Sequence, residues 1–407
     1  MSKINDLIKK LCPYGVEYKK ICDVCNVVGR IGFRGYKRED QVEKGNGAIS
    51  LSPSNIINGK INYNECTYIS WDKYNESPEI MVNEGDVIFC KTASVGKTCY
   101  IENMPEKTTI NPQLILLKNI SINSKYLSYC LKTKDFQIKA NSIKGLGTIP
   151  TLSQKDFNEL TVPVPPLEVQ EEIVRILDKF GKLEAELEAE LEARKSQYEF
   201  WRGKLLNMDY KKIKLLNLCD KVNNINWKND NNNYKYIDLS SVNRENNQVV
   251  ETSNISKENA PSRARQIVKT KDVLFGTTRP MLKRITLISQ EYDNQICSTG
   301  YCVLRPNREK VVPEWLYFNL QTEDFYKYVE NFQQGASYPS ISDNAVKNYE
   351  ISLPPSDVQI KVINVLTKFD KLTNDISEGL PVEIELRRKQ YEYYRNKLLN
   401  FKELKNE

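Results

Sequence analysis

Two short segments carry basic and hydroxyl side chains that could bind phosphates and base edges. They span residues 91–97 and 277–284, and each directly follows a strand-like apolar run. Lys and Arg pair with phosphate oxygens, Ser and Thr can bond phosphates or bases, and Arg can hold guanine through two hydrogen bonds. A solvated hairpin turn is the alternative interpretation. The predicted contacts in these two segments are Lys91, Thr92, Ser94, Lys97, Thr277, Thr278, Arg279, Lys283 and Arg284.

Further candidates lie in glycine-rich turns at 144–148 and 333–338, and in loops whose sequences differ between the two halves of the chain. A glutamine amide can pair with adenine through two hydrogen bonds, although these turns could equally be ordinary loops. The additional predicted contacts are Arg34, Tyr36, Lys144, Thr148, Arg263, Gln333, Gln334, Ser337 and Tyr338.

No convincing catalytic motif accompanies them. The chain contains no histidine, which removes the commonest general base and most catalytic zinc sites. Gly96-Lys97-Thr98 lacks the glycine that a phosphate-binding loop needs five places earlier, because position 91 is lysine. A nuclease reading of Glu17-Tyr18-Lys19 has no carboxylate cluster to support it. We therefore predict a non-catalytic chain without a cofactor or a metal of its own.

The distribution of charge favours a nucleic-acid surface on the segments that precede the long helices described below. Residues 1–165 hold 22 basic and 17 acidic side chains, and residues 207–354 hold 20 and 17. Residues 166–206 are acidic, with 7 basic and 10 acidic side chains. A basic surface suits nucleic acid, whereas an acidic helix suits protein contacts. No apolar run is long enough for a membrane span and no signal peptide opens the chain, so we expect a cytoplasmic protein with reduced cysteines.

The chain is an internal duplication. Its clearest repeated segment is Val169–Leu205, answered by Val358–Leu398, and both copies end in Lys-Leu-Leu-Asn. Earlier anchors also match, such as 147–153 with 336–342. Strand-like runs such as Val87–Phe89 alternate with turns, so we predict two α+β lobes with mostly antiparallel sheets. The predicted segments are lobe 1 at 1–165, a helix at 166–207, lobe 2 at 208–354 and a second helix at 355–407.

The repeated segments predict two long helices that pair antiparallel as a coiled coil. Their apolar residues recur at steps of three and four, and we expect this apolar seam, which includes Leu183 and Leu372, to pack against the partner helix. Gly379 and Pro381 predict a break in the second helix. Ser356-x-x-Gln359 predicts a capping box at its start. An extra four-residue step in the second copy marks a spacer of adjustable length.

The chain resembles the specificity (S) subunit of type I restriction-modification systems. The resemblance lies in two lobes that each end in Pro-Pro, in helices beginning x-x-Val-Gln, and in the residues around 194–206 and 379–399. It covers essentially the whole sequence.

The resemblance implies a pseudo-two-fold molecule whose two target recognition domains, separated by the helices, each read half of an asymmetric two-part DNA site. The helices would set the gap and dock two adenine-methylating modification subunits, and a restriction/translocase subunit could join. S-adenosylmethionine, ATP and Mg²⁺ would then belong to these partner subunits. The alternative from another class is a coiled-coil scaffold with two protein-binding lobes and no DNA.

Overall fold

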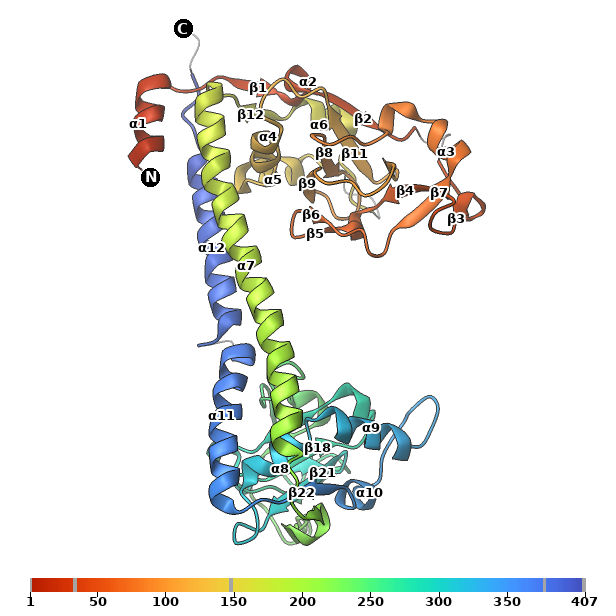
Figure 1. Cartoon of the computed structure of the whole chain (residues 1–407), viewed down its shortest axis with the longest axis vertical. Coiled ribbons are helices and arrows are strands. Elements are labelled where there is room, and N and C mark those ends of the chain that lie inside the picture. Colours follow the sequence, from red (N-terminus) through yellow and green to blue (C-terminus); the bar gives the residue numbers. More distant parts are fainter. Residues whose placement is uncertain (1, 32–34, 146–148, 376–377, 405–407) are drawn as a thin grey trace. The chain divides into compact units, whose positions relative to one another are not determined.

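The computed structural model describes residues 2–31, 35–145, 149–375 and 378–404. It forms two compact units, residues 1–184 with 387–407 and residues 185–386. Each unit contains one α+β lobe and parts of the long helices (Figure 1). Mostly antiparallel sheets and a long helix confirm the predicted fold class.

Lobe 1 is built on two four-stranded sheets. One has the order β2-β11-β8-β9 and is fully antiparallel; the other, β10-β4-β7-β3, pairs β10 and β4 in parallel. The strands are β1 (Tyr18–Lys20), β2 (Asn26–Gly29), β3 (Gln41–Val42), β4 (Gly47–Leu51), β5 (Ile56–Ile57), β6 (Lys60–Ile61), β7 (Thr67–Ser70), β8 (Val87–Cys90), β9 (Thr98–Tyr100), β10 (Thr108–Ile110), β11 (Leu114–Lys118) and β12 (Thr161–Pro163). The helices are α1 (Ser2–Leu11), α2 (Ile21–Val24), α3 (Trp71–Asn75), α4 (Ser124–Leu131), α5 (Lys134–Ser142) and α6 (Gln154–Glu159).

Lobe 2 repeats this plan. Its sheet β14-β21-β18-β19 matches β2-β11-β8-β9, and its second sheet again contains one parallel pair, β15 with β20. The strands are β13 (Lys212–Lys214), β14 (Cys219–Asp220), β15 (Tyr234–Ile237), β16 (Ser253–Ile255), β17 (Ala264–Ile267), β18 (Val273–Gly276), β19 (Ile285–Leu287), β20 (Ile296–Ser298), β21 (Tyr301–Pro306) and β22 (Glu350–Ser352). The helices are α8 (Pro313–Asn319), α9 (Glu323–Phe332) and α10 (Asp343–Lys347). The two halves of the chain are therefore repeats in structure as well as in sequence.

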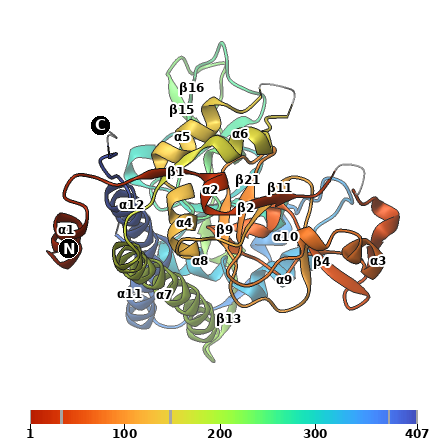
Figure 2. The ribbon, with the colours of Figure 1, turned by 90° about the horizontal axis from the view of Figure 1, so that it is seen from above.

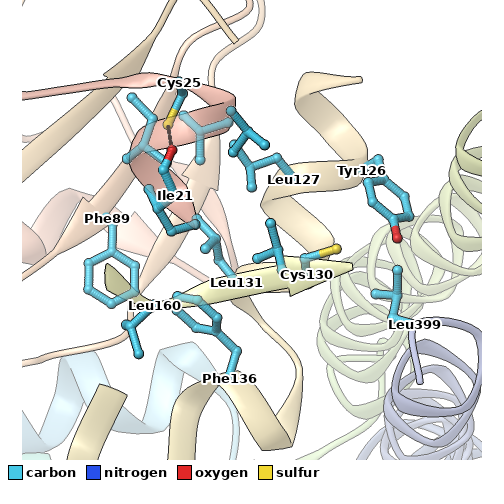
Figure 3. Packing of buried hydrophobic residues seen from close by; sticks show 14 of the residues in the cluster. Ile21, Cys25, Phe89, Tyr126, Leu127, Cys130, Leu131, Phe136, Leu160 and Leu399 are labelled. Carbon is cyan, nitrogen blue, oxygen red and sulfur yellow. Dashed lines mark hydrogen bonds between the residues drawn. The ribbon is translucent and has the colours of Figure 1, made fainter. Parts of the chain in front are cut away.

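The core of unit 1 packs β8 and β11 against α4, α5 and α6 (Figure 3). Phe89 of β8 lies 4.6 Å from Phe157 and 6.3 Å from Phe136, measured between ring centroids. Tyr126 of α4 is fully buried and donates its hydroxyl to Pro163 O. Leu399 belongs to the same cluster, so the end of the chain is part of this core. Burying such side chains stabilises the fold by about 2 kcal/mol each.

The first long helix, α7 (Leu167–Leu206), has 40 residues. The second repeat forms two helices, α11 (Ser356–Asn374) and α12 (Leu380–Leu398). In unit 1, the first part of α7 lies beside α12 (Figure 1, Figure 2). Phe180 of α7 stacks on Tyr394 of α12 at 5.3 Å, and Glu184 accepts a hydrogen bond from Arg388. Later positions of α7 meet earlier positions of α12, so the two segments run antiparallel. In unit 2, Tyr198 stacks on Phe369 of α11 at 6.2 Å.

The predicted apolar seam is only partly buried. Leu183 is 48% exposed and Leu372 is 39% exposed, so a large part of each side chain remains accessible to solvent. Buried apolar residues lie both where a helix packs on its lobe and at the start of α12, where Leu380 is 7% and Ile384 is 6% exposed. Val169 and Ile173 in unit 1 and Leu366 in unit 2 are fully buried.

The predicted capping box at Ser356 is wrong. The α11 N-cap is Pro355, and its side chain makes no capping hydrogen bond. Gln359 instead donates from Nε2 to Pro354 O at 2.8 Å and accepts at Oε1 from Val312 N at 3.0 Å. The glutamine reaches into the lobe because the Pro-Pro carbonyl and a loop amide would otherwise be buried without partners.

Gly379 allows the chain to turn between α11 and α12. A Cβ at this position would lie 2.5 Å from Lys371 O and 2.7 Å from Asp375 O, which no side chain tolerates. Pro381 is the second residue of α12, where a helix needs no backbone N–H. In the part of the chain that the structure describes, no helix is long and apolar enough to cross a membrane.

Candidate nucleic-acid interface

In lobe 2, two loops meet at the end of strand β18. The first is the turn 277–284 between β18 and β19, and the second is the hairpin 333–340 that follows α9. The hairpin is closed by reciprocal 2.8 Å hydrogen bonds between the backbones of Gln334 and Ser340. Two more backbone bonds join it to the turn: Arg279 N donates to Pro339 O at 2.7 Å, and Ile341 N donates to Thr277 O at 3.0 Å. The structure thus brings two separately predicted segments into one surface.

Two side chains from this surface stack on each other. Arg279 is exposed, and its guanidinium carbon lies 4.0 Å from the centroid of the Tyr338 ring. Tyr338 is itself 66% exposed. Lys283 is held in a similar way, 4.8 Å from the ring of Tyr326. Attraction between a cation and a ring face limits the motion of the charged group while its hydrogen-bond donors stay available.

Lobe 1 contains the same backbone arrangement. Ala93 N donates to Pro150 O at 2.9 Å and Leu152 N donates to Lys91 O at 2.8 Å. Gly145 N donates to Thr151 O at 2.9 Å, which matches one of the two bonds between Gln334 and Ser340. Each contact has its counterpart at the matching position of the other lobe, so the two loops form one repeated frame, which we call the joined loops.

The side chains on the joined loops differ between the lobes. Ala93 occupies the position of Arg279, and both residues have positive φ angles, 62° and 49°. Ile149, which is 59% exposed, occupies the position of Tyr338. The sequence prediction missed Ala93 and Ile149 because it looked for polar groups. Aligning the repeats position by position would have identified both.

Three predicted contacts are engaged in the fold. Thr277 is buried and its hydroxyl donates to Gly300 O at 2.9 Å. Lys91 is half-buried, and this burial lowers the pKa of its ammonium group. The ammonium of Lys97 donates to Pro53 O at 2.9 Å and Ile56 O at 3.2 Å, which ties the turn to the β5–β6 region. The hydroxyl of Thr277 is therefore already used within the fold, whereas Lys91 and the exposed Lys97 remain predicted DNA contacts.

Most of the other predicted residues lie on or near the joined loops, and Tyr36 lies elsewhere in lobe 1. In lobe 2, Arg263 O accepts from Thr299 N, next to Gly300, whose carbonyl binds Thr277 N. In lobe 1, Tyr36 accepts a hydrogen bond from Ser50, and Arg30 lies over its ring. Together with Lys91 and Lys97, the exposed or half-buried residues that remain candidates are Tyr36, Thr92, Ser94, Lys144, Arg263, Thr278, Arg279, Lys283, Arg284, Gln334, Ser337 and Tyr338.

Three predicted positions stand apart from this group. The Gln333 side-chain oxygen is buried with no hydrogen-bond partner among the described residues, so it does not face solvent. Arg34 and Thr148 lie outside the described residues.

The described residues of the joined loops form no arrangement typical of a catalytic centre. Within the described ranges, no group of three or more Cys, Asp or Glu side chains could hold a metal ion. What both loops offer is exposed cationic, hydroxyl, amide and apolar groups on a fixed backbone. That set suits recognition of an anionic polymer and its bases.

The model of the type I restriction modification DNA specificity domain matches the chain twice, at residues 13–193 and 207–386. The chain belongs to this family. The two matches correspond to the two structural repeats. Specificity subunits are the non-catalytic, sequence-recognising components of type I restriction-modification complexes, and this chain is such a subunit.

Individual relatives agree with this assignment. A protein of Mycoplasma pneumoniae named as a type I specificity subunit is 30% identical, over 62% of this chain and 91% of that one. The specificity subunit of the type I restriction enzyme EcoR124I/EcoR124II of Escherichia coli is 28% identical, over 68% and 70%. The crystal structure of an S subunit from M. genitalium covers 95% of this chain and 96% of its own, with a TM-score of 0.50 and 13% identity. At that identity it shows the shared fold alone.

Proposed function

We propose that each lobe reads one half of a two-part DNA sequence through its joined loops. Lobe 1 comprises residues 1–165 and lobe 2 residues 208–354. The observation that carries this proposal is one backbone frame, present in both lobes, with different exposed side chains at matching positions. A repeated frame with different side chains can bind two DNA segments in the same manner while selecting different bases.

We further propose that the helical segments, 166–207 and 355–407, set the gap between the half-sites and bind two methyltransferase subunits. Continuity of α7 supports the first role, because this helix begins in unit 1 and ends in unit 2. Exposed aromatic side chains support the second, since Phe200 is 63% exposed and Tyr393 is 59% exposed. S-adenosylmethionine would act in those subunits, and ATP and Mg²⁺ in a restriction subunit that joins them in the cytoplasm.

An insertion in α7 tests the role of the helices. One additional Leu-Glu-Ala-Glu after Glu190 adds about 6 Å of helix. We expect the unspecified gap in the recognised sequence to grow by one or two base pairs, at about 3.4 Å each. Both half-sites should stay the same, because the lobes are unchanged. Mapping methylated adenines in cells that express the variant with its methyltransferase measures both quantities.

The matched control inserts the same four residues after Asn231, which is exposed in a loop of lobe 2. This variant has the same added mass and charge but an unchanged helix, so its gap should equal that of the wild type. Altered half-site bases in the Glu190 variant, or an unchanged gap with full methylation, would contradict the proposed role of the helices.

A further inference from the structure

We propose that Arg279, held against the ring of Tyr338, reads a guanine in the half-site of lobe 2. We propose also that the matching pair in lobe 1, Ala93 and Ile149, makes its half-site differ at the equivalent base pair. This inference rests on the proposed function. It names the side chains that select a base in each lobe, and it names guanine as the base that Arg279 selects.

Both positions belong to the fixed part of the joined loops, so their side chains leave from a defined backbone. Arg279 N is bonded to Pro339 O, and Ala93 N is bonded to Pro150 O. A positive φ costs a residue other than glycine about 1 kcal/mol or more. Both lobes nevertheless adopt it without glycine. The surrounding hydrogen bonds therefore impose the conformation, and a change of side chain there leaves the frame in place.

The position of the Arg279 side chain suits hydrogen bonding to a base. Its guanidinium lies 4.0 Å from the centroid of the Tyr338 ring, and stacking on an aromatic face leaves the edge of the guanidinium free to donate hydrogen bonds. Tyr338 is two-thirds exposed, so the pair stands out from the surface. Arg279 takes part in none of the ion pairs identified among the described residues, so no carboxylate competes for its donors.

Guanine is the base that fits these donors. In the major groove, guanine presents two acceptors, O6 and N7, whose spacing matches the two donors of an arginine guanidinium. An arginine side chain that is already stacked on a ring before DNA binds loses less conformational entropy on binding. In lobe 1 the same place holds only apolar groups, from Ala93 and Ile149. Apolar side chains at base edges contact the methyl group of thymine rather than the acceptors of guanine. The two lobes should therefore select different bases at this position.

The experiment selects bound sequences from a pool of randomised DNA duplexes with the purified full chain. The wild type should enrich two half-sites separated by a gap. Arg279→Ala should lose one guanine from one half-site and leave the other half-site unchanged. Affinity for the wild-type sequence should fall about tenfold to a hundredfold. Because Ala already occupies this backbone position in lobe 1, the variant should fold, and its thermal unfolding verifies that.

Three further measurements separate base reading from simple charge or packing. Replacing the selected guanine with 7-deazaguanine, which lacks the N7 acceptor, should weaken the wild type but not Arg279→Ala. Arg279→Lys keeps the charge but not the planar fork, so it should weaken the guanine preference. Tyr338→Phe keeps the ring and should bind as the wild type, whereas Tyr338→Ala should weaken binding several-fold.

The reciprocal exchange is the strongest test. Ala93→Arg combined with Ile149→Tyr should create a guanine preference in the other half-site. If the wild type selects a two-part sequence that Arg279→Ala also selects unchanged, the inference is wrong and the proposed function stands. If the wild type enriches no sequence at all, both are overturned.

Discussion

Two buried glutamines hold the lobes to their helices. Gln170 donates to Pro165 O at 2.7 Å and accepts from Asn123 N at 2.9 Å, and Gln359 makes the same pair of bonds in unit 2. Their exposed fractions are only 3% and 2%. A side chain that satisfies one buried carbonyl and one buried amide fixes the angle at which the helix leaves the lobe.

Gln359→Ala should lower the free energy of unfolding by about 2 kcal/mol, because it leaves Pro354 O and Val312 N buried without their partner. Chemical denaturation followed by circular dichroism measures this. Gln197→Ala is the matched control, since Gln197 is exposed and, among the described residues, bonds only Arg194 of the same helix. That control should change stability by less than about 0.5 kcal/mol. Equal losses in the two variants would show that the buried bonds contribute nothing.

At the scale of secondary-structure elements, helix α1 contacts helix α7 in unit 1. Ile4 of α1 is fully buried, and Lys3 donates to Glu172 of α7 at 3.3 Å. Glu172 also accepts two hydrogen bonds from Arg175, at 2.5 and 2.8 Å. Chiefly because of the bonds from Arg175, the pKa of Glu172 is lowered to about 2. This carboxylate is thus more stable as an anion in the folded chain than in the unfolded one.

The lowered pKa gives a defined dependence of stability on pH. Above the ordinary glutamate pKa of about 4.3, the ion pairs contribute fully. As pH falls toward 2, the unfolded state takes up a proton first, so this contribution declines. Glu172→Gln should therefore be less stable than the wild type at pH 7, and the difference should shrink between pH 4.5 and pH 2. Denaturation curves at several pH values measure it; a difference that stays constant down to pH 2 would refute the assignment.

On the scale of the whole chain, the positive charge lies on the parts that we propose bind DNA. The net charge is +6, and the basic excess lies on the residues that form the lobes. A protein that neutralises DNA phosphates releases counterions, so its affinity falls steeply with salt. Protein-binding lobes on a scaffold would show a much weaker dependence.

Raising salt from 50 to 200 mM should lower the affinity of the full chain for DNA about tenfold for every two phosphates contacted. Fluorescence anisotropy with a labelled duplex measures this slope. Arg279→Ala should reduce affinity with little effect on the slope if Arg279 contacts a base, whereas Lys283→Ala should reduce the slope if Lys283 contacts a phosphate. A flat salt response of the wild type would favour the scaffold alternative.

The sequence alone determined the duplication, the long helix and the α+β character of both lobes. These follow from local signals: the spacing of apolar residues, proline and glycine at breaks, and matching residues such as 147–153 and 336–342. It also indicated the segments around Arg279 and Tyr338, because basic, hydroxyl and glycine-rich stretches are visible without any fold. The sequence also showed that Gln170 and Gln359 belong to a repeated x-x-Val-Gln motif. It did not show which groups these glutamines bind.

Only the tertiary structure decided which of these residues act together. Arg279 and Tyr338 are far apart in the sequence, and the backbone hydrogen bond from Arg279 N to Pro339 O helps to bring them into contact. It also showed that Thr277 is buried, that Leu183 is exposed, and that Gln359 binds a loop instead of capping a helix. A sequence pattern records the preference of each short segment, whereas burial and pairing depend on the segments packed against it, and those are fixed only when the chain has folded.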